Sequence, residues 1–427
     1  MKLRNLFLST LAVCMFASCS KDDDGIQGPV EPVDASLSFA ASSVIKTRAS
    51  AGSESDTKAK ENIVKDLYVF IFKVPADAGE NASKMLLAGN GSVSATEEGK
   101  SVTSIEHVIV KVTPNMEDPT AASDDNFIAV LVANPSKGFV PSTLQDLRNA
   151  TLTNSIEKYK VSESYLPMVS EELPISGLKP IVKNEDGTTI HNENWVCGKN
   201  SVKYGTGENP PADLQKIPLT RLVARVQVEK IINKIDEAYQ GASFQLTNLS
   251  LVNVRPYATM LGGKAGEQYE YVKGFESPNY KEYDEWIYPT FTGEALTESY
   301  KSALSSTYEL NLSGETAFGG ETGNEQFLGY TFANPADAKY KTALLITGLF
   351  KRSADSKGEI KNFRVILQDT DLNEPVQIVP NNVYKLTVTI TGEGSSNEDK
   401  IESNAHISVK IEVLNWYVVD QKEIDVN

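Results

Sequence analysis

Short stretches in which apolar and polar residues alternate recur along this chain, with turn-forming residues between them. In the first of these stretches, Leu37 and Phe39 fall on one side of an extended backbone, and Ser36 and Ser38 fall on the other. A period of two is typical of a strand that buries one face. The stretch ends close to Arg48, where a polar and charged run begins. We therefore expect a strand of a hydrophobic core that leads directly into an exposed segment.

Later stretches predict further strands, some alternating and some apolar on both faces. The expected strands cover residues 64–74, 105–112, 127–133, 217–228, 244–254, 327–332, 342–350, 363–367 and 383–390, with a bulge in the fifth, where the alternation slips. Residues 81–100 predict a hairpin with a Gly-rich turn, and residues 184–200 predict loops and short edge strands. A short helix is expected at residues 143–150, capped by Ser142 or Thr143.

Many short strands with few helices indicate an all-β fold built from antiparallel β-sandwiches. A chain of 427 residues exceeds the length of one ordinary domain. Gly and Pro residues cluster at residues 204–213, where we expect the boundary between two sandwiches in series. The expected N-terminal sandwich spans residues 49–212, and the C-terminal one spans residues 213–427.

The beginning of the chain has the organisation of a lipoprotein signal peptide. Two basic residues precede an apolar stretch, residues 6–16, that is too short to cross a bilayer as a permanent helix. The small residues that follow end at Cys19, which we expect to carry the acyl chains. Residues 1–19 are therefore interpreted as the signal peptide and residues 20–48 as a propeptide. A cut further along the chain would end this membrane contact.

The last alternating stretch changes phase before the chain ends. Apolar residues alternate strictly over residues 407–413, after which Trp416 and Val418 fall on the opposite face, and Ile424 and Val426 resume the pattern. A slip of one residue moves apolar side chains to the other face of a sheet. Two interpretations are open here: an edge strand bent over its own sandwich, or a projecting strand that pairs with another subunit.

Composition and motifs argue against nucleic-acid binding and against catalysis. A net charge of −16 disfavours contact with a phosphate backbone. His107, His191 and His406 lack metal-ligand spacing, and neither a nucleophile elbow nor a phosphate-binding loop occurs. We therefore expect no enzymatic activity, no metal and no cofactor. Cys197, which follows Trp195 closely, is expected to be a buried structural residue.

Several motifs together resemble the fimbrillins of Bacteroidia, the shaft subunits of type V pili, and most closely the branch that builds minor fimbriae. They are the lipobox at Cys19 and the stretches at residues 66–72, 129–135, 217–228, 380–388 and 413–416, which span nearly the whole chain. Two features depart from the family pattern: Phe16 in the lipobox, and residues 257–308, which contain eight of the 17 tyrosines.

The resemblance implies two transthyretin-like Greek-key β-sandwich domains and export as a lipoprotein to the outer membrane. It also implies that a trypsin-like protease cuts between Arg48 and Ala49 and removes the leading strand with Leu37 and Phe39. The groove that remains would accept the C-terminal strand of the next copy, which docks through Trp416, Val418, Ile424 and Val426.

The implied product is an extracellular fimbrium that supports adhesion and biofilm formation. Its implied partners are other copies of the chain, accessory fimbrial subunits, the maturation protease, and host or bacterial surface ligands. The alternatives are a tip or anchor subunit of a fimbrium, and a permanently anchored surface lipoprotein that binds glycans. The Tyr-rich residues 257–308 fit either a binding surface or ordinary core and loop positions.

Overall fold

The structure is a computed structural model in which nearly all regular elements of the described residues are β-strands. It describes residues 30–43, 61–135, 139–150, 165–183, 189–190, 192–206, 211, 214–235, 239–252, 259–261, 271–272, 280–281, 309–310, 327–335, 341–367, 377–396 and 407–415. Within these ranges there is one α-helix, α1 (Leu144–Asn149), and one 3-10 helix, η1 (Ala82–Lys84). The expected all-β fold class is confirmed, whereas its division into two transthyretin-like Greek-key domains stays a prediction.

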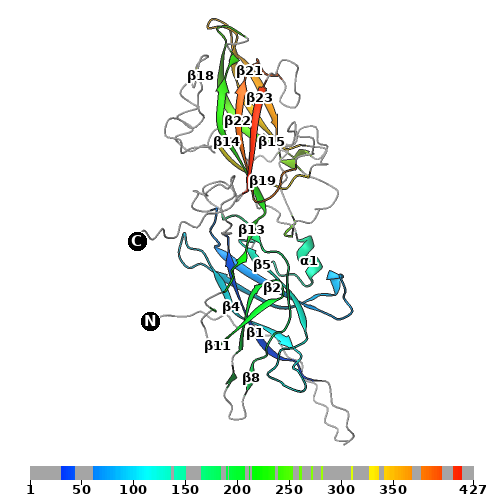
Figure 1. The fold of residues 1–427 in the computed structure, drawn as a ribbon. Coiled ribbons are helices and arrows are strands. Elements are labelled where there is room, and N and C mark those ends of the chain that lie inside the picture. Colours follow the sequence, from blue (N-terminus) through cyan, green and yellow to red (C-terminus); the bar gives the residue numbers. More distant parts are fainter. Residues whose placement is uncertain are drawn as a thin grey trace, which may run out of the picture.

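The described residues form four larger sheets, two from the first half of the chain at one end and two from the second half at the other (Figure 1). The first sheet has the order β11-β10-β1-β12, and β4 pairs with the other edge of β1. Its strands are β1 (Val33–Ser42), β4 (Ser104–Val112), β10 (Asn192–Gly198), β11 (Ser201–Thr206) and β12 (Ile217–Pro218).

The second sheet of the first half has the order β13-β6-β5-β2-β3, and β7 also pairs with β5. Its strands are β2 (Asp66–Val74), β3 (Leu86–Ser94), β5 (Asn126–Ala133), β6 (Met168–Val169), β7 (Leu173–Ile175) and β13 (Thr220–Arg221). The strand β2 pairs with β3 on one edge and with β5 on the other. It is apolar on both faces because both are buried, with Leu67 and Val69 fully buried on one face and Phe72 on the other. The predicted strands at residues 64–74, 105–112 and 127–133 are thus confirmed.

The expected hairpin at residues 81–100 is wrong, because this stretch is η1 followed by the single strand β3, which pairs with β2 along its length. Its glycines serve close packing rather than a turn. A Cβ added at Gly89 would lie 2.8 Å from the Ile109 carbonyl oxygen of β4, and one at Gly91 would lie 3.0 Å from Val108. Glycine lets the backbone of β3 approach β4 at these two positions.

The expectation of loops and edge strands at residues 184–200 is also wrong for β10, which lies inside its sheet between β1 and β11. Its polar residues Glu193 and Asn194 are buried, and their side chains are hydrogen-bonded to β1. A buried strand with these residues does not show the apolar pattern by which interior strands are recognised. The next strand, β11, also falls partly in the Gly- and Pro-rich stretch expected to be a boundary.

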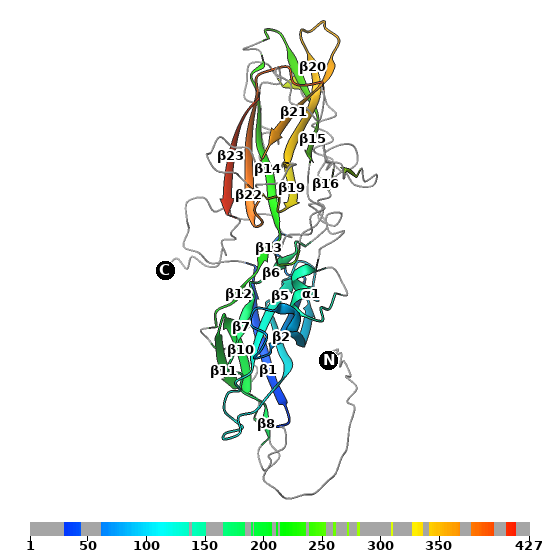
Figure 2. The same ribbon diagram turned by 90° about the vertical axis from the view of Figure 1, so that its right-hand side faces the viewer.

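The second half forms two further four-stranded sheets, ordered β19-β14-β22-β23 and β18-β15-β20-β21 (Figure 2). Their strands are β14 (Val223–Asn233), β15 (Ser243–Val252), β18 (Glu309–Leu310), β19 (Phe327–Phe332), β20 (Ala343–Lys351), β21 (Glu359–Ile366), β22 (Asn382–Ile390) and β23 (Ile407–Asn415). The bulge expected in β15 is confirmed, since the register with β20 shifts between Leu246 and Asn248.

Two small pairs complete the described strands: β8 (Val182–Lys183) with β9 (Thr189–Ile190), and β16 (Tyr271–Val272) with β17 (Tyr280–Lys281). Most ladders are antiparallel, but β1 runs parallel to both β10 and β12, β14 runs parallel to β22, and β16 runs parallel to β17. The sheets are therefore mixed rather than purely antiparallel.

The expected single strand at residues 217–228 is divided in three. Its first two pieces, β12 and β13, pair with β1 and β6 of the first half, and only β14 joins the second half. Pro218 has no backbone N–H to donate to a continuing ladder, which accounts for the interruption. The boundary expected after residue 212 stays a prediction, and the change of pairing partners occurs at Leu222, between β13 and β14.

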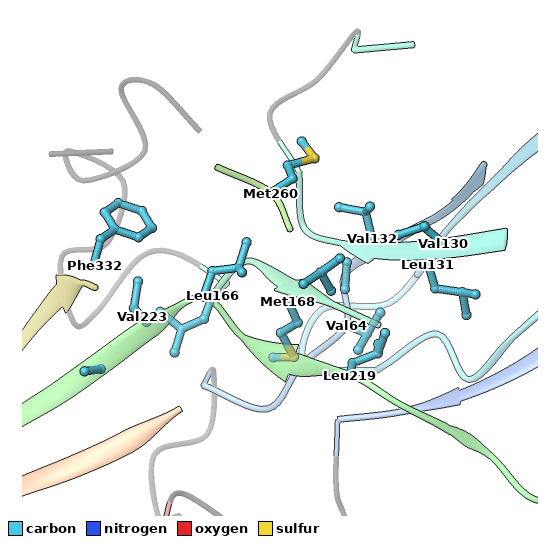
Figure 3. Close-up of a cluster of buried hydrophobic side chains, with 14 of the residues drawn as sticks. Val64, Val130, Leu131, Val132, Leu166, Met168, Leu219, Val223, Met260 and Phe332 are labelled. Carbon is cyan, nitrogen blue, oxygen red and sulfur yellow. The ribbon is translucent and has the colours of Figure 1, made fainter. Parts of the chain in front are cut away.

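The hydrophobic core continues from one half of the molecule into the other. Leu166, Met168 and Leu219 belong to the same buried cluster as Val223 and Phe332 of the second half (Figure 3). Because apolar side chains fill the junction, the two halves are packed together rather than joined by an exposed linker.

The helix α1 forms as expected. Thr143 caps its first turn and accepts a hydrogen bond from the Asp146 amide, while Leu144 and Leu147 are buried. None of the helices in the described parts of the chain is long and apolar enough to span a membrane.

Candidate functional site

The strand β1 occupies an interior position, with a partner on each side. It pairs antiparallel with β4 from Val33↔Val112 to Ala40↔Ser104, and parallel with β10 from Ser36↔Glu193 to Phe39↔Val196. Further along, Ala41 and Ser42 pair with β12. Because neighbouring strands of the same chain pair with both edges of β1, the loss of β1 would leave two unpaired rows of backbone N–H and C=O groups.

One face of β1 belongs to the hydrophobic core. Ala35, Leu37 and Phe39 are 0% exposed and Ala41 is 2% exposed, and all four belong to the main core cluster. Burial of a Leu or Phe side chain contributes about 1.5–3 kcal/mol each, so this face anchors the strand strongly. Leu37 and Phe39 thus lie in a core strand, as expected.

The opposite face of β1 is held by a buried carboxylate. The hydroxyl of Ser36 donates to Glu193 Oε2 at 2.8 Å, and that of Ser38 donates to Glu193 Oε1 at 2.6 Å. His107 Nδ1 lies 3.0 Å from Glu193 Oε2. The ladder between β1 and β4 bulges beside Ser38, where His107 has φ 59° and its amide donates to the Ser38 hydroxyl at 3.2 Å.

A side chain also holds the backbone of β1. The Asn194 amide group donates to the Ser36 carbonyl at 2.8 Å and to the Lys179 carbonyl at 2.9 Å, and its oxygen accepts from the Lys179 amide at 2.9 Å. Asn194 is fully buried, so these bonds also satisfy its own polar atoms. Sequence patterns gave no indication of Glu193 or Asn194, because nothing in the sequence marks a polar residue of β10 as a partner of β1.

The segment that contains the expected cleavage site begins and ends at the same place in the fold. Residues 44–60, with Arg48 and Ala49, lie outside the described residues. On either side of them, the Ser43 hydroxyl donates to the Asn62 carbonyl at 2.7 Å. A cut between these anchored ends would therefore break the covalent connection between β1 and the residues after it, and would leave the other connections between described elements intact.

Two buried arginines hold the chain just after this segment. Arg225 Nη1 lies 2.9 Å from Glu61 Oε2, with side chains only 3% and 4% exposed. Arg221 donates from Nε to the Glu61 carbonyl at 3.2 Å, and from its Nη atoms to the side chains of Asn62 and Asn381. This group connects the start of the first half to β13, to β14 and to the turn before β22, and sequence reasoning did not find it.

The strand β23 lies at an edge of its sheet and pairs antiparallel with β22 up to Asn382↔Asn415. The expected donor residues Trp416, Val418, Ile424 and Val426 follow it directly but lie outside the described residues, as does the expected lipidation site Cys19.

Cys197 is buried as expected, with its Sγ 3.5 Å from the Trp195 carbonyl. Across the described ranges, no cluster of three or more His, Cys, Asp or Glu side chains could hold a metal ion.

Comparison with known proteins finds a similarity in this part of the chain. Residues 35–219, which begin within β1 and end just after β12, match the family described as major fimbrial subunit protein (FimA). No curated protein sequence matches the chain.

Solved structures share the fold over most of the chain. A fimbrilin from Porphyromonas gingivalis matches with a TM-score of 0.56 at 15% identity, covering 91% of this chain and 99% of its own. A proposed cell adhesion protein from Parabacteroides distasonis matches with a TM-score of 0.55 at 15% identity, covering 92% and 100%. Another from Bacteroides eggerthii matches with a TM-score of 0.53 at 14% identity, covering 91% and 98%.

Proposed function

We propose that this chain is a subunit of a cell-surface fimbrium and that it polymerises by exchanging strands between copies; the match of residues 35–219 to the family described as major fimbrial subunit protein supports the first part. In this proposal each copy loses β1 after cleavage at Arg48, and the C-terminal strand of the next copy takes its place. The product is a fimbrium on the cell surface that supports adhesion and biofilm formation.

The observation that carries the proposal is the position of β1. It lies between β4 and β10, with Leu37 and Phe39 in the core, yet its far end leads into a segment whose two ends meet at Ser43 and Asn62. A strand with this connection can leave after a single cut. Its departure exposes apolar surface and two unpaired edges, which are the conditions that favour the addition of a strand from another chain.

The donor in this proposal is the segment that follows β23. If Trp416, Val418, Ile424 and Val426 dock as expected, each buried side chain contributes about 1.5–3 kcal/mol before the cost of ordering the segment. The backbone ladder with β4 and β10 adds hydrogen bonds on both edges. The edge position of β23 supports this role. A segment that follows an edge strand can leave its sheet without crossing the other strands of that sheet.

Export and maturation follow from the same arrangement. Acyl chains on Cys19 hold the precursor at the outer membrane, and a trypsin-like protease cuts between Arg48 and Ala49. Because Cys19 and β1 both precede the cut, one cleavage releases the anchor and opens the groove. Accessory fimbrial subunits and surface ligands complete the proposed set of partners.

The test is cleavage and assembly of the full-length protein. Trypsin-like cleavage is expected to give a mature N-terminus at Ala49 by mass spectrometry, and laddered oligomers on denaturing gels. Arg48→Gln is expected to abolish both, while the matched change Lys46→Gln leaves both intact. Deleting residues 416–427 is expected to permit cleavage but not laddering. Surface material with an acylated Cys19 and an uncut Arg48 would instead favour a permanently anchored lipoprotein or an anchor subunit.

A further inference from the structure

The contacts on the polar face of β1 bear on which part of an incoming strand can occupy the positions of Leu37 and Phe39. Between these two residues lies Ser38, whose hydroxyl donates to Glu193 at 2.6 Å. Glu193 is 4% exposed, and its remaining contact is with His107 Nδ1. When β1 leaves, this carboxylate loses both serine hydroxyls.

A buried carboxylate discriminates between incoming side chains by charge. It is stabilised by hydrogen-bond donors and strongly disfavours a second carboxylate at the same place. Apolar side chains alone cannot fix the register, because a slip of an even number of residues returns the same face of a strand to the core. The residue that takes the place of Ser38 therefore decides which register is accepted.

The C-terminal segment offers two stretches with the same apolar spacing. Trp416 and Val418 flank Tyr417, whereas Ile424 and Val426 flank Asp425. With the first stretch in the groove, a phenolic hydroxyl faces Glu193; with the second, a carboxylate faces it.

A neighbouring residue also favours the hydroxyl. Trp195 lies in register with Ser38 on β10, and its Nε1 is buried without a hydrogen-bond partner in the part of the chain that the structure describes. A hydroxyl oxygen can accept a bond from such a donor as well as donate to a carboxylate.

We propose that Glu193 is a specificity-determining residue of the groove, which directs Trp416–Val418 of a second copy, rather than Ile424–Val426, to the position of Leu37 and Phe39. This inference rests on the proposed strand exchange and goes beyond it by assigning the register.

The test compares charge at residue 417 in two backgrounds of the full-length chain. Tyr417→Asp and the matched neutral change Tyr417→Asn are each made in the wild type and together with Glu193→Gln. After cleavage, laddered oligomers are measured over a series of protein concentrations. In the wild type, Tyr417→Asp is expected to need at least about tenfold more protein for assembly than Tyr417→Asn. With Glu193→Gln the two differ by less than about threefold. Asp425→Asn changes assembly by less than about threefold in either background.

Three results would overturn the inference. An equal difference between Tyr417→Asp and Tyr417→Asn in both backgrounds would exclude a role for Glu193. Stronger assembly of Asp425→Asn, with no effect of Tyr417→Asp, would assign the second stretch to the groove. This comparison uses only variants with Glu193 unchanged, so it can be made even if the Glu193→Gln variant does not fold. Cleaved wild-type chains that form no oligomers would overturn the proposed strand exchange, and the inference with it.

Discussion

Replacing Phe39 by alanine should destabilise the uncut precursor but not the assembled polymer. Phe39 is fully buried in β1, and truncating a buried Phe to Ala costs about 3–5 kcal/mol of unfolding free energy, because it removes apolar contacts and leaves a cavity. The precursor should lose this amount. If the proposed exchange occurs, the polymer should lose nothing, because β1 would no longer be part of the subunit after cleavage.

The matched control is Phe70→Ala in β2. Phe70 is 2% exposed and belongs to the same core cluster, but β2 lies after the cleavage segment and remains in every form of the protein. Its truncation should therefore destabilise the precursor and the polymer alike, by about 3–5 kcal/mol in each.

The assay is urea unfolding of the uncut precursor, with Arg48→Gln to prevent cleavage, beside urea disassembly of the polymer at one protein concentration. For a loss of this size, the unfolding midpoint of the Phe39→Ala precursor should fall by about 1 M or more. A polymer of Phe39→Ala chains that disassembles as early as the Phe70→Ala polymer would show that β1 stays in the mature subunit. The proposed exchange would then be refuted.

Three further changes test the fold around the site. Gly89→Ala should cost about 1–3 kcal/mol in thermal unfolding, because its Cβ would lie 2.8 Å from the backbone of β4. Glu61→Ala removes the buried carboxylate beside Arg225 and should cost about 3–5 kcal/mol by the same measurement. Burial raises the pKa of Asp125, but the Lys73 ammonium and a backbone amide outweigh it and hold that pKa below its ordinary value. Asp125→Asn should therefore destabilise at neutral pH, with a difference from wild type that disappears as pH falls through the acidic range where Asp125 protonates.

Much of the fold could be predicted because its signals are local. The strand β20 is a mainly apolar stretch, β4 alternates between buried and exposed positions, and α1 begins at a capping threonine. Each of these patterns is contained within about ten residues and depends on one buried face or one cap. For the same reason the bulge in β15 could be recognised from a slip in phase.

The features that could not be predicted depend on partners that are distant in the sequence. Gly89 and Gly91 suggest a turn until β4 is seen beside them. The pairing of β1 with β10 joins residues 157 positions apart at Ser36 and Glu193. From the sequence alone, Arg225 is indistinguishable from an ordinary polar residue of an alternating strand, and only the structure shows its buried ion pair with Glu61. In each case the side chain is explained by a contact that no local pattern contains.

Within the single strand β1, one face could be predicted from a local pattern, whereas the other depends on a partner that is distant in the sequence. The apolar face of β1, with Leu37 and Phe39, could be predicted from its period of two, and for the same reason it is not selective: any strand with that period can present a similar face. The polar face meets Glu193, which only a suitable side chain at one position satisfies. Affinity for a replacement strand therefore comes mainly from the predictable face, whereas the choice among strands comes from the other. In the proposed exchange, the groove holds its own strand tightly, releases it after one cut and then accepts one particular stretch of a neighbouring copy, and this sequence of steps needs both faces.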